Sequence, residues 1–257
     1  MLRRHSPANV ILGAAATLGG AGIAWALDAR RRDERTALIH RTMVEVLLNT
    51  LCAGDPSTAR HSRRVADLTA ALGETCRLRR EDHARLRVAA LLHDLGKLDD
   101  QLSPIIHSHH RLNASERHHV EEHTYESAFI LEPLEKIHPG IGQIVESHHE
   151  RWDGKGYPRG LSGASIPIES RLISLADVFD ALTEPRSYRG PMEIEAAVQE
   201  IRKNAGTKFD PAVVERMERP EVWSAWLEIV RKGRGVEDDL AAAEHSDTNK
   251  SSASARD

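Results

Sequence analysis

Apolar residues recur at helical spacing along most of this chain, and four of these stripes each include a histidine. His61 begins one such stripe, which continues at helical spacing through Val65, Leu68 and Leu72. The same spacing predicts inward-facing histidines on three further helices, at His93, His123 and His148. One buried imidazole is usually a hydrogen-bonded core residue, but four without a shared partner would be costly. The pattern therefore predicts an all-α protein with a histidine cluster in its interior.

Helix boundaries are marked by local signals. Asp55-Pro56 and Asp210-Pro211 each supply an N-cap followed by a proline at the first helical position. No segment shows the alternation of apolar and polar residues that is typical of a β-strand. We expect helices at about 35–52, 56–73, 80–95, 115–132, 139–149, 168–183, 193–203, 211–218 and 221–231.

Composition narrows the class of protein. The length of 257 residues suits one good-sized domain or two small ones, and the net charge of −4 gives no general case for nucleic-acid binding. Two cysteines, Cys52 and Cys76, are too few for a disulfide framework and fit a reducing compartment. Ten of the 15 histidines lie between His93 and His149. Such a cluster with nearby aspartates suits a metal centre.

The N-terminus differs from the rest of the chain. Residues 10–27 form a run without charged residues, and arginines flank this run on both sides. The run is just long enough to span a bilayer. The arginines that follow it favour a membrane anchor with the folded domain in the cytoplasm. A cleaved signal peptide, suggested by Ala24-Trp25-Ala26, and a soluble end are the alternatives.

These observations predict three parts: an anchor over 1–30, a folded domain over 31–232 and a disordered polar tail over 233–257. Ala16, Gly20 and Ala24 recur at four-residue spacing, which would let two anchor helices pack closely and leaves a homodimer as one option.

Three motifs carry chemistry. His93 and Asp94 open the run HDLGK, and adjacent helical residues about 100° apart can both reach one metal ion. Asp177 stands among apolar neighbours, with Asp180 one turn further on the same face. The third motif is HHERWDGKGYP at 148–158, whose two histidines open a loop with four glycines and two prolines over 152–167.

These motifs resemble the HD-GYP family of cyclic di-GMP phosphodiesterases, a branch of the HD metal-dependent phosphohydrolases. The resemblance runs from about Leu47 to Met217 and includes IPIESRLISLADVFDALT and FDP. It implies an HD-type helical bundle with a C-terminal GYP extension. It also implies hydrolysis of cyclic di-GMP to linear pGpG or GMP. A non-catalytic sensor or partner-docking module, and a phosphohydrolase for another nucleotide or phosphoester, are the alternatives.

The resemblance also implies roles for individual residues. Two divalent metal ions, iron or manganese, would be held by His61, His93, Asp94, His123, His148, His149 and Asp177. Asp94 would bridge the two ions and act with Lys97 in catalysis. Substrate would be contacted by Lys97, Tyr157, Arg186 and Arg189.

Two departures from the family qualify this expectation. The segment 99–112 is rich in histidine where the family has proline, glycine and lysine, so it is either a solvated loop or an additional metal-binding segment. Some family members use a glutamate one turn before the first ligand histidine for a third metal. Here that turn holds Ser57 and no carboxylate, so we expect two metals.

Overall fold

The computed structural model describes residues 30–31, 35–36, 38–53, 55–98, 102, 105, 112–184 and 190–233. The chain divides into two units, Met1–Leu47 and Leu48–Asp257, and the described residues of the first unit are helical. Nearly all of the predicted anchor and of the predicted tail lies outside the described residues. Within the described ranges, no helix is both long and apolar enough to cross a membrane.

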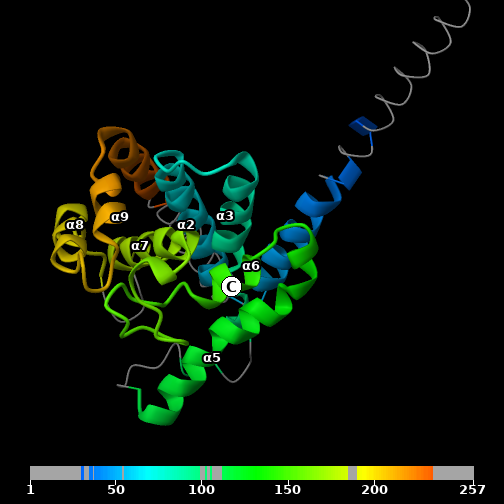
Figure 1. Ribbon diagram of the computed structural model, residues 1–257, viewed down its shortest axis with the longest axis horizontal. Coiled ribbons are helices and arrows are strands. Elements are labelled where there is room, and N and C mark those ends of the chain that lie inside the picture. Colours follow the sequence, from blue (N-terminus) through cyan, green and yellow to red (C-terminus); the bar gives the residue numbers. More distant parts are fainter. Residues whose placement is uncertain are drawn as a thin grey trace, which may run out of the picture. The chain divides into compact units, whose positions relative to one another are not determined.

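The second unit is built of helices, which Figure 1 labels. Among the described residues no strand forms, and only two isolated β-bridges occur, so the all-helical prediction is confirmed. Unlabelled helical segments cover 48–53 and 220–233. The α-helices are α2 (Pro56–Glu74), α3 (Arg80–Leu92), α5 (Ala114–Ile130), α6 (Ile141–Glu146), α7 (Ile168–Thr183), α8 (Ile194–Lys203) and α9 (Pro211–Met217). The 3-10 helices are η1 (Leu95–Leu98), η2 (Glu132–Lys136) and η3 (Gly163–Ser165).

The predicted N-caps are confirmed. The Asp55 carboxylate accepts hydrogen bonds from the backbone N–H groups of Ser57 and Thr58, at 2.9 and 3.2 Å. Asp210 accepts one from the N–H of Ala212 at 2.8 Å. These carboxylates satisfy donors that have no partner within the helix and so fix where α2 and α9 begin.

Two helices end earlier than their sequence periodicity predicts. α3 ends at Leu92, so His93 is its C-cap, and α6 ends at Glu146, so His148 lies in the turn that follows. After α6 the backbone tightens, because the N–H of His148 donates to the carbonyl of Val145 and that of Glu150 to Ser147. The side chains of His93 and His148 are nevertheless fully buried. The predicted burial is confirmed, although these two histidines leave the helices that were expected to carry them.

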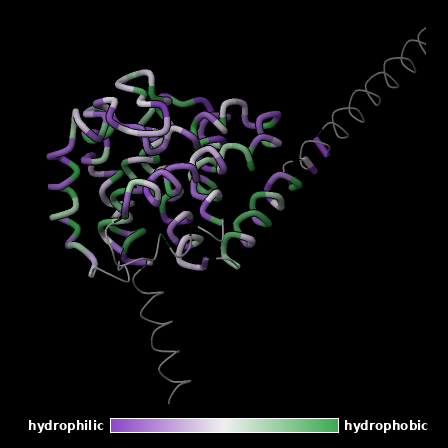
Figure 2. The backbone as a smooth tube through the Cα atoms, turned by 90° about the horizontal axis from the view of Figure 1, so that it is seen from below, coloured by the Kyte–Doolittle hydropathy of each residue, from purple (hydrophilic) through white to green (hydrophobic). Residues whose placement is uncertain are grey.

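The core joins α2, α3, α7 and the last helical segment. α2 packs against α3 and α7, and its apolar stripe of Val65, Leu68 and Leu72 has no exposed surface. Trp226, in 220–233, donates its indole N–H to the Leu68 carbonyl at 2.9 Å, and its ring centroid lies 4.5 Å from that of Phe179. Figure 2 shows hydrophobic and hydrophilic stretches alternating along the helices, as expected for elements that bury one face.

A glycine sets the distance between η1 and α5. A Cβ added to Gly96 would lie 2.4 Å from the carbonyl oxygen of His123, and the N–H of Gly96 donates to the Ser127 hydroxyl at 2.8 Å. No other residue type allows this approach, which brings the HDLGK segment against the helix that carries His123.

This close approach predicts that Gly96→Ala destabilises the protein. Forcing a methyl group into a packed site costs about 1–3 kcal/mol, which corresponds to a melting temperature lower by roughly 2–12 °C for a chain of this size. Gly190→Ala is the matched control, because a Cβ there would meet no atom of the described residues within 4 Å. Thermal unfolding followed by circular dichroism checks both variants, and equal melting temperatures would contradict this account of η1.

Candidate metal centre

Two groups of metal-ligand side chains converge inside the second unit. One consists of Asp94, His123, His148 and His149, and the other of His61, His93 and Asp177. Within each group, one ligand atom from every residue lies within 4.8 Å of the others. These are the seven side chains that the sequence analysis selected, and segments from α2 to α7 supply them. The fold therefore brings the whole predicted ligand set together.

Asp94 lies between the two groups. Its Oδ2 is 3.3 Å from Nε2 of His93 and 3.8 Å from Nε2 of His61. Its Oδ1 is 3.4 Å from Nε2 of His123 and 4.0 Å from Nε2 of His148. Each carboxylate oxygen thus faces a different group, which is the arrangement a carboxylate needs to bind two ions at once.

Hydrogen bonds at the far ring nitrogen orient three of the histidines. The Nδ1–H groups of His93, His123 and His148 donate to the carbonyls of Ala90, Val120 and Val145, each three residues earlier in the chain. A donor at Nδ1 leaves the lone pair on Nε2, which points into the cluster. The local backbone therefore selects the tautomer that can bind a metal.

His61 is held by a carboxylate instead. Its Nδ1–H donates to Oδ2 of Asp180 at 2.7 Å, while Nε2 lies 3.1 Å from Oδ1 of Asp177. Arg64 donates from Nε to the other oxygen of Asp180 at 2.7 Å. Asp180 was expected on the same face as Asp177, but no role for it was predicted from the sequence. Its position one turn after Asp177, with Arg64 close to His61 in sequence, was the available signal.

A metal ion fits this site on the evidence of its buried atoms. Nε2 of His93, His123 and His148 and Oδ1 of Asp94 are buried, and in the described part of the chain they have no hydrogen-bond partner. Buried polar atoms without partners are costly, and several facing one space require a shared partner. Imidazole nitrogen and carboxylate oxygen suit first-row divalent ions, so the donor set fits the predicted metals.

The electrostatics of the cluster leave most ligands in the form that binds metal. Burial lowers the pKa of His123 to about 4, and burial with the neighbouring His123 lowers that of His149 to about 3. Burial raises the pKa of Asp94, but His93 and Lys97 outweigh it and hold the pKa well below its ordinary value. These imidazoles are therefore neutral and the carboxylate ionised near pH 7.

His61 is the exception. Burial lowers its pKa, but the hydrogen bonds to Asp177 and Asp180 outweigh burial and raise the pKa from 6.5 to about 9. Metal binding at His61 near pH 7 would therefore release a proton.

Two predicted substrate-contacting residues lie beside the cluster. Lys97 was expected at the rim beyond α3. It lies in η1 with its ammonium group 2.7 Å from Oδ2 of Asp94 and its side chain 24 % exposed. The Tyr157 ring centroid is 4.9 Å from that of His149, and burial raises the pKa of its phenol. Arg186 and Arg189 lie outside the described residues, as do His107, His109 and His110.

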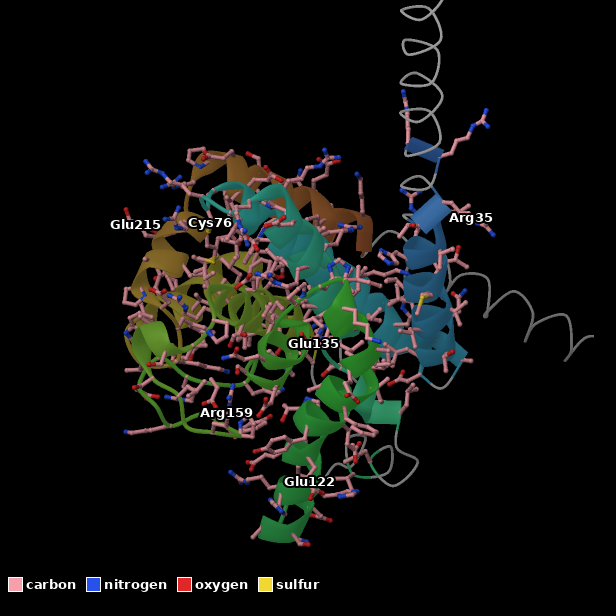
Figure 3. The ribbon with its side chains drawn as sticks, turned by 45° about the vertical axis from the view of Figure 1, so that its right-hand side comes forward. Arg35, Cys76, Glu122, Glu135, Arg159 and Glu215 are labelled. Atoms are coloured by element: carbon pink, nitrogen blue, oxygen red, sulfur yellow. The ribbon has the colours of Figure 1, made fainter. Side chains whose placement is uncertain are left out.

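Glu150 holds the GYP loop and was missed by the sequence analysis. Its side chain is 2 % exposed, and its two oxygens accept hydrogen bonds from the N–H groups of Arg159 and Leu161, at 2.7 and 2.9 Å. Arg159, labelled in Figure 3, also donates to the Ser147 hydroxyl at 3.0 Å. Glu150 directly follows the His148-His149 pair, so the same short segment supplies two candidate ligands and the anchor of the loop.

The segment at 207–208 forms backbone hydrogen bonds with this loop. The N–H groups of Trp152 and Asp153 donate to the carbonyls of Lys208 and Thr207, at 3.2 and 2.8 Å. Lys208 is half-buried, and burial lowers the pKa of its ammonium group although Asp177 opposes this shift. The segment FDP at 209–211 was expected only as part of the family resemblance, and no role was predicted for the lysine before it.

A sequence profile of the HD domain matches residues 45–213, the stretch that contains all seven candidate ligands. The chain belongs to the HD domain family. This confirms the resemblance drawn from His61, HDLGK, His123 and the GYP segment.

Curated relatives of this HD domain chain are named as cyclic dinucleotide phosphodiesterases. The 3'3'-cGAMP-specific phosphodiesterase 1 of Vibrio cholerae is 38 % identical over 162 residues, which cover 61 % of this chain and 36 % of the relative. The cyclic di-GMP phosphodiesterase of Thermotoga maritima is 36 % identical over 166 residues, which cover 63 % of this chain and 44 % of the relative. The chain thus spans less than half the length of these relatives.

A solved structure shares the fold. The crystal structure of a V. cholerae cyclic GMP-AMP phosphodiesterase superposes with a TM-score of 0.55 at 23 % identity, covering 75 % of this chain and 52 % of that one. The HD-type helical fold that the sequence predicts is confirmed.

The contact between Asp180 and His61 predicts a role for Asp180 in metal binding. Asp180→Ala should lower metal affinity by about 10–100-fold, the usual effect of removing a group that orients a ligand. Asp180→Asn keeps an acceptor oxygen and should lower metal affinity less than Asp180→Ala does. Competition with a chelator of known affinity measures this.

Asp82→Ala is the matched control, because it removes another buried carboxylate, paired with Arg79 at 2.9 Å, that is not part of either ligand group. Equal metal affinity in Asp180→Ala and Asp82→Ala, with both folded by circular dichroism, would exclude the orienting role.

Proposed function

We propose that this protein is a metal-dependent phosphodiesterase that hydrolyses cyclic di-GMP to linear pGpG or GMP. The observation that carries the proposal is the position of Asp94, whose two oxygens face separate groups of ligand side chains. The names of the relatives support a cyclic dinucleotide as the class of substrate. Because some of them are named for 3'3'-cGAMP, that dinucleotide is the second candidate substrate.

The proposed cofactor is a pair of divalent ions, iron or manganese. One would bind to the group that contains His61, His93 and Asp177, the other to the group that contains His123, His148 and His149, with Asp94 shared. When bound, such a pair neutralises phosphate charge, lowers the pKa of a water molecule and orients an in-line attack on phosphorus.

The chain's own residues would position the substrate. Lys97 carries a charge next to Asp94 and is partly exposed, so its ammonium group can reach a phosphate oxygen. Tyr157 lies against His149 at the edge of the cluster and can contact the ribose or base of a dinucleotide. Arg186 and Arg189 are proposed as further phosphate contacts on the basis of sequence alone.

The complete ligand set argues against the two other functions considered. A non-catalytic sensor or docking module would not require seven converging metal ligands. It would also not require buried Nε2 atoms without hydrogen-bond partners on three of these histidines. A phosphohydrolase for an unrelated phosphoester would have the same metal ligands. The relatives, however, are named as cyclic dinucleotide phosphodiesterases, which favours a cyclic dinucleotide as the substrate.

Membrane anchoring is a separate part of the proposal. It rests on the uncharged run at 10–27 and on the arginines that follow it, which would keep the catalytic domain in the cytoplasm. A homodimer through the anchor is proposed on the small residues in that run.

A substrate panel tests the proposed activity. The full chain, loaded with iron(II) or manganese(II), is incubated with cyclic di-GMP, 3'3'-cGAMP, cyclic di-AMP and bis(p-nitrophenyl) phosphate, and products are separated by liquid chromatography. We expect cyclic di-GMP to be opened fastest. Faster hydrolysis of 3'3'-cGAMP would select the second candidate. Binding of metal and cyclic di-GMP without turnover would identify a sensor instead.

Lys97→Ala separates catalysis from metal binding in the same assay. The variant should keep its metal, because the seven candidate ligands remain, and lose about 10²–10³-fold in rate, the range for removing one charge-stabilising group. An unchanged rate would remove Lys97 from the mechanism.

A further inference from the structure

A second concave site lies apart from the metal ligands. Its cavity has a volume of about 680 Å³ and is formed by the residues after α2, the start of α7 and α9 with the turn that follows it. None of the seven candidate metal ligands lines this cavity. Small-molecule sites typically have volumes of about 300–1,000 Å³, so the cavity is of a suitable size.

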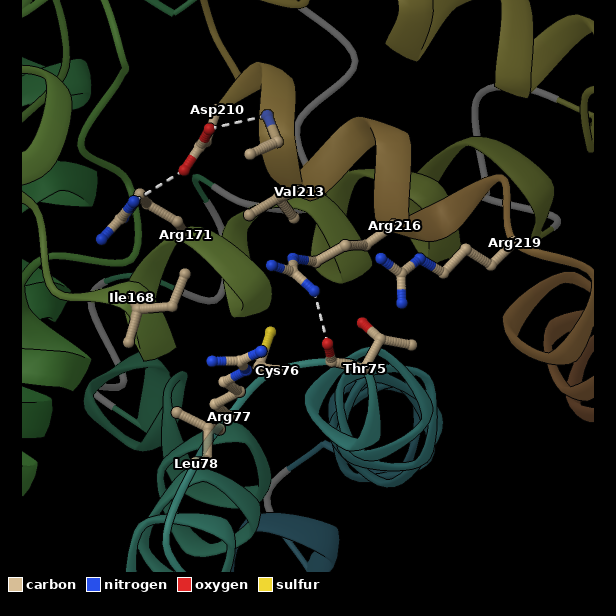
Figure 4. Close-up of a pocket in the computed structure, with 11 residues that line it drawn as sticks. Thr75, Cys76, Arg77, Leu78, Ile168, Arg171, Asp210, Val213, Arg216 and Arg219 are labelled. Carbon is tan, nitrogen blue, oxygen red and sulfur yellow. Dashed lines mark hydrogen bonds and ion pairs between the residues drawn. The ribbon is translucent and has the colours of Figure 1, made fainter.

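The lining of this cavity is strongly basic. Four arginines, Arg77, Arg171, Arg216 and Arg219, face it together with a single acidic residue, Asp210. Figure 4 shows that these side chains come from separate elements, with Arg216 and Arg219 on α9 and the following turn, Arg171 on α7 and Arg77 after α2. Since the whole chain carries a net charge of −4, this local excess of positive charge is not a general property of the protein.

Two of the arginines have structural partners. Arg171 donates to Oδ2 of Asp210 at 2.6 Å, and its guanidinium group lies 5.7 Å from the Trp152 ring centroid. Arg216 donates to the Thr75 carbonyl at the end of α2. These contacts connect the elements around the cavity and neutralise Asp210, the one acidic residue among the described residues that line it.

The other two arginines have no such role. In the ranges that the structure describes, the side chains of Arg77 and Arg219 form neither an ion pair nor a hydrogen bond, and both residues are exposed at the cavity. Their charge is therefore available to a ligand. Guanidinium groups bind phosphate oxygens through paired N–H donors, a geometry that few other side chains match.

The remaining wall is apolar. Leu78, Ile168 and Val213 line the cavity between the arginines. A site for inorganic phosphate alone would gain nothing from these side chains, whereas a base or ribose could pack against them. We propose that this arginine pocket, defined by Arg77, Arg171, Arg216 and Arg219, is a second binding site for a phosphate-bearing small molecule of the nucleotide class.

Binding of GMP to metal-free protein tests the proposal. The full chain is stripped with a chelator, passed through a desalting column into Tris chloride buffer and titrated with GMP by isothermal calorimetry. Without metal the cluster around Asp94 cannot hold a phosphate through an ion, and no turnover can occur. The outcome is therefore independent of the proposed phosphodiesterase activity. We expect one GMP to bind per chain, with an affinity that falls as sodium chloride is raised.

The double variant Arg77→Ala/Arg219→Ala should bind GMP at least about tenfold more weakly, because charge-assisted hydrogen bonds are lost. The matched control is Arg80→Ala/Arg117→Ala, which removes two exposed arginines outside the cavity and should bind GMP within about twofold of the original chain. Thermal unfolding checks that each variant folds. Arg77→Gln/Arg219→Gln serves as a second pair that keeps the side-chain bulk.

Three results would overturn the proposal. These are no GMP binding at millimolar concentration, an equal loss of affinity in the control variant, and inorganic phosphate binding as tightly as GMP. The last result would reduce the pocket to a simple anion site without a role for its apolar wall.

Discussion

The burial of the Asp94 carboxylate among histidines is the constraint on which the rest of this structure depends. A charged group with 1 % exposed surface is stable only if opposite charges or hydrogen-bond donors surround it. Here the ammonium group of Lys97 and the protonated ring of His61 supply positive charge, whereas Nε2 of His93, His123 and His148 face the carboxylate with lone pairs. Shared metal ions would compensate the carboxylate and the histidine lone pairs together, which explains why so polar an interior can persist inside a helical bundle.

The scaffold around this carboxylate fixes the ligands before any ion binds. Backbone carbonyls orient His93, His123 and His148, and Asp180 with Arg64 orients His61. Gly96 allows η1 to approach α5, and Glu150 fixes the loop that begins directly after His149. Such prior orientation matters because misplaced ligands weaken metal binding even when every ligand is present.

Much of this site was predictable from sequence, because helical periodicity decides which side of a helix a residue faces. Helical spacing predicted that His61 and His123 lie on buried faces, and the family resemblance added the metal-ligand roles of His149 and Asp177. Periodicity failed at the ends of α3 and α6, where tighter turns replace the helix around His93 and His148. It also could not find Glu150, whose contacts depend on how the irregular loop after it turns back, or the arginine pocket, which forms where segments far apart in sequence meet.

Metal stoichiometry tests the central claim, that Asp94 joins two ligand groups into one binuclear centre. Elemental analysis of the full chain, loaded with manganese and desalted, should give about two ions per chain. Asp94→Ala should lose most of both ions, whereas Ser57→Ala should keep them, because Ser57 lies beside the Asp55 cap and belongs to neither ligand group. One ion in the unaltered chain, or two ions retained in Asp94→Ala, would contradict the account.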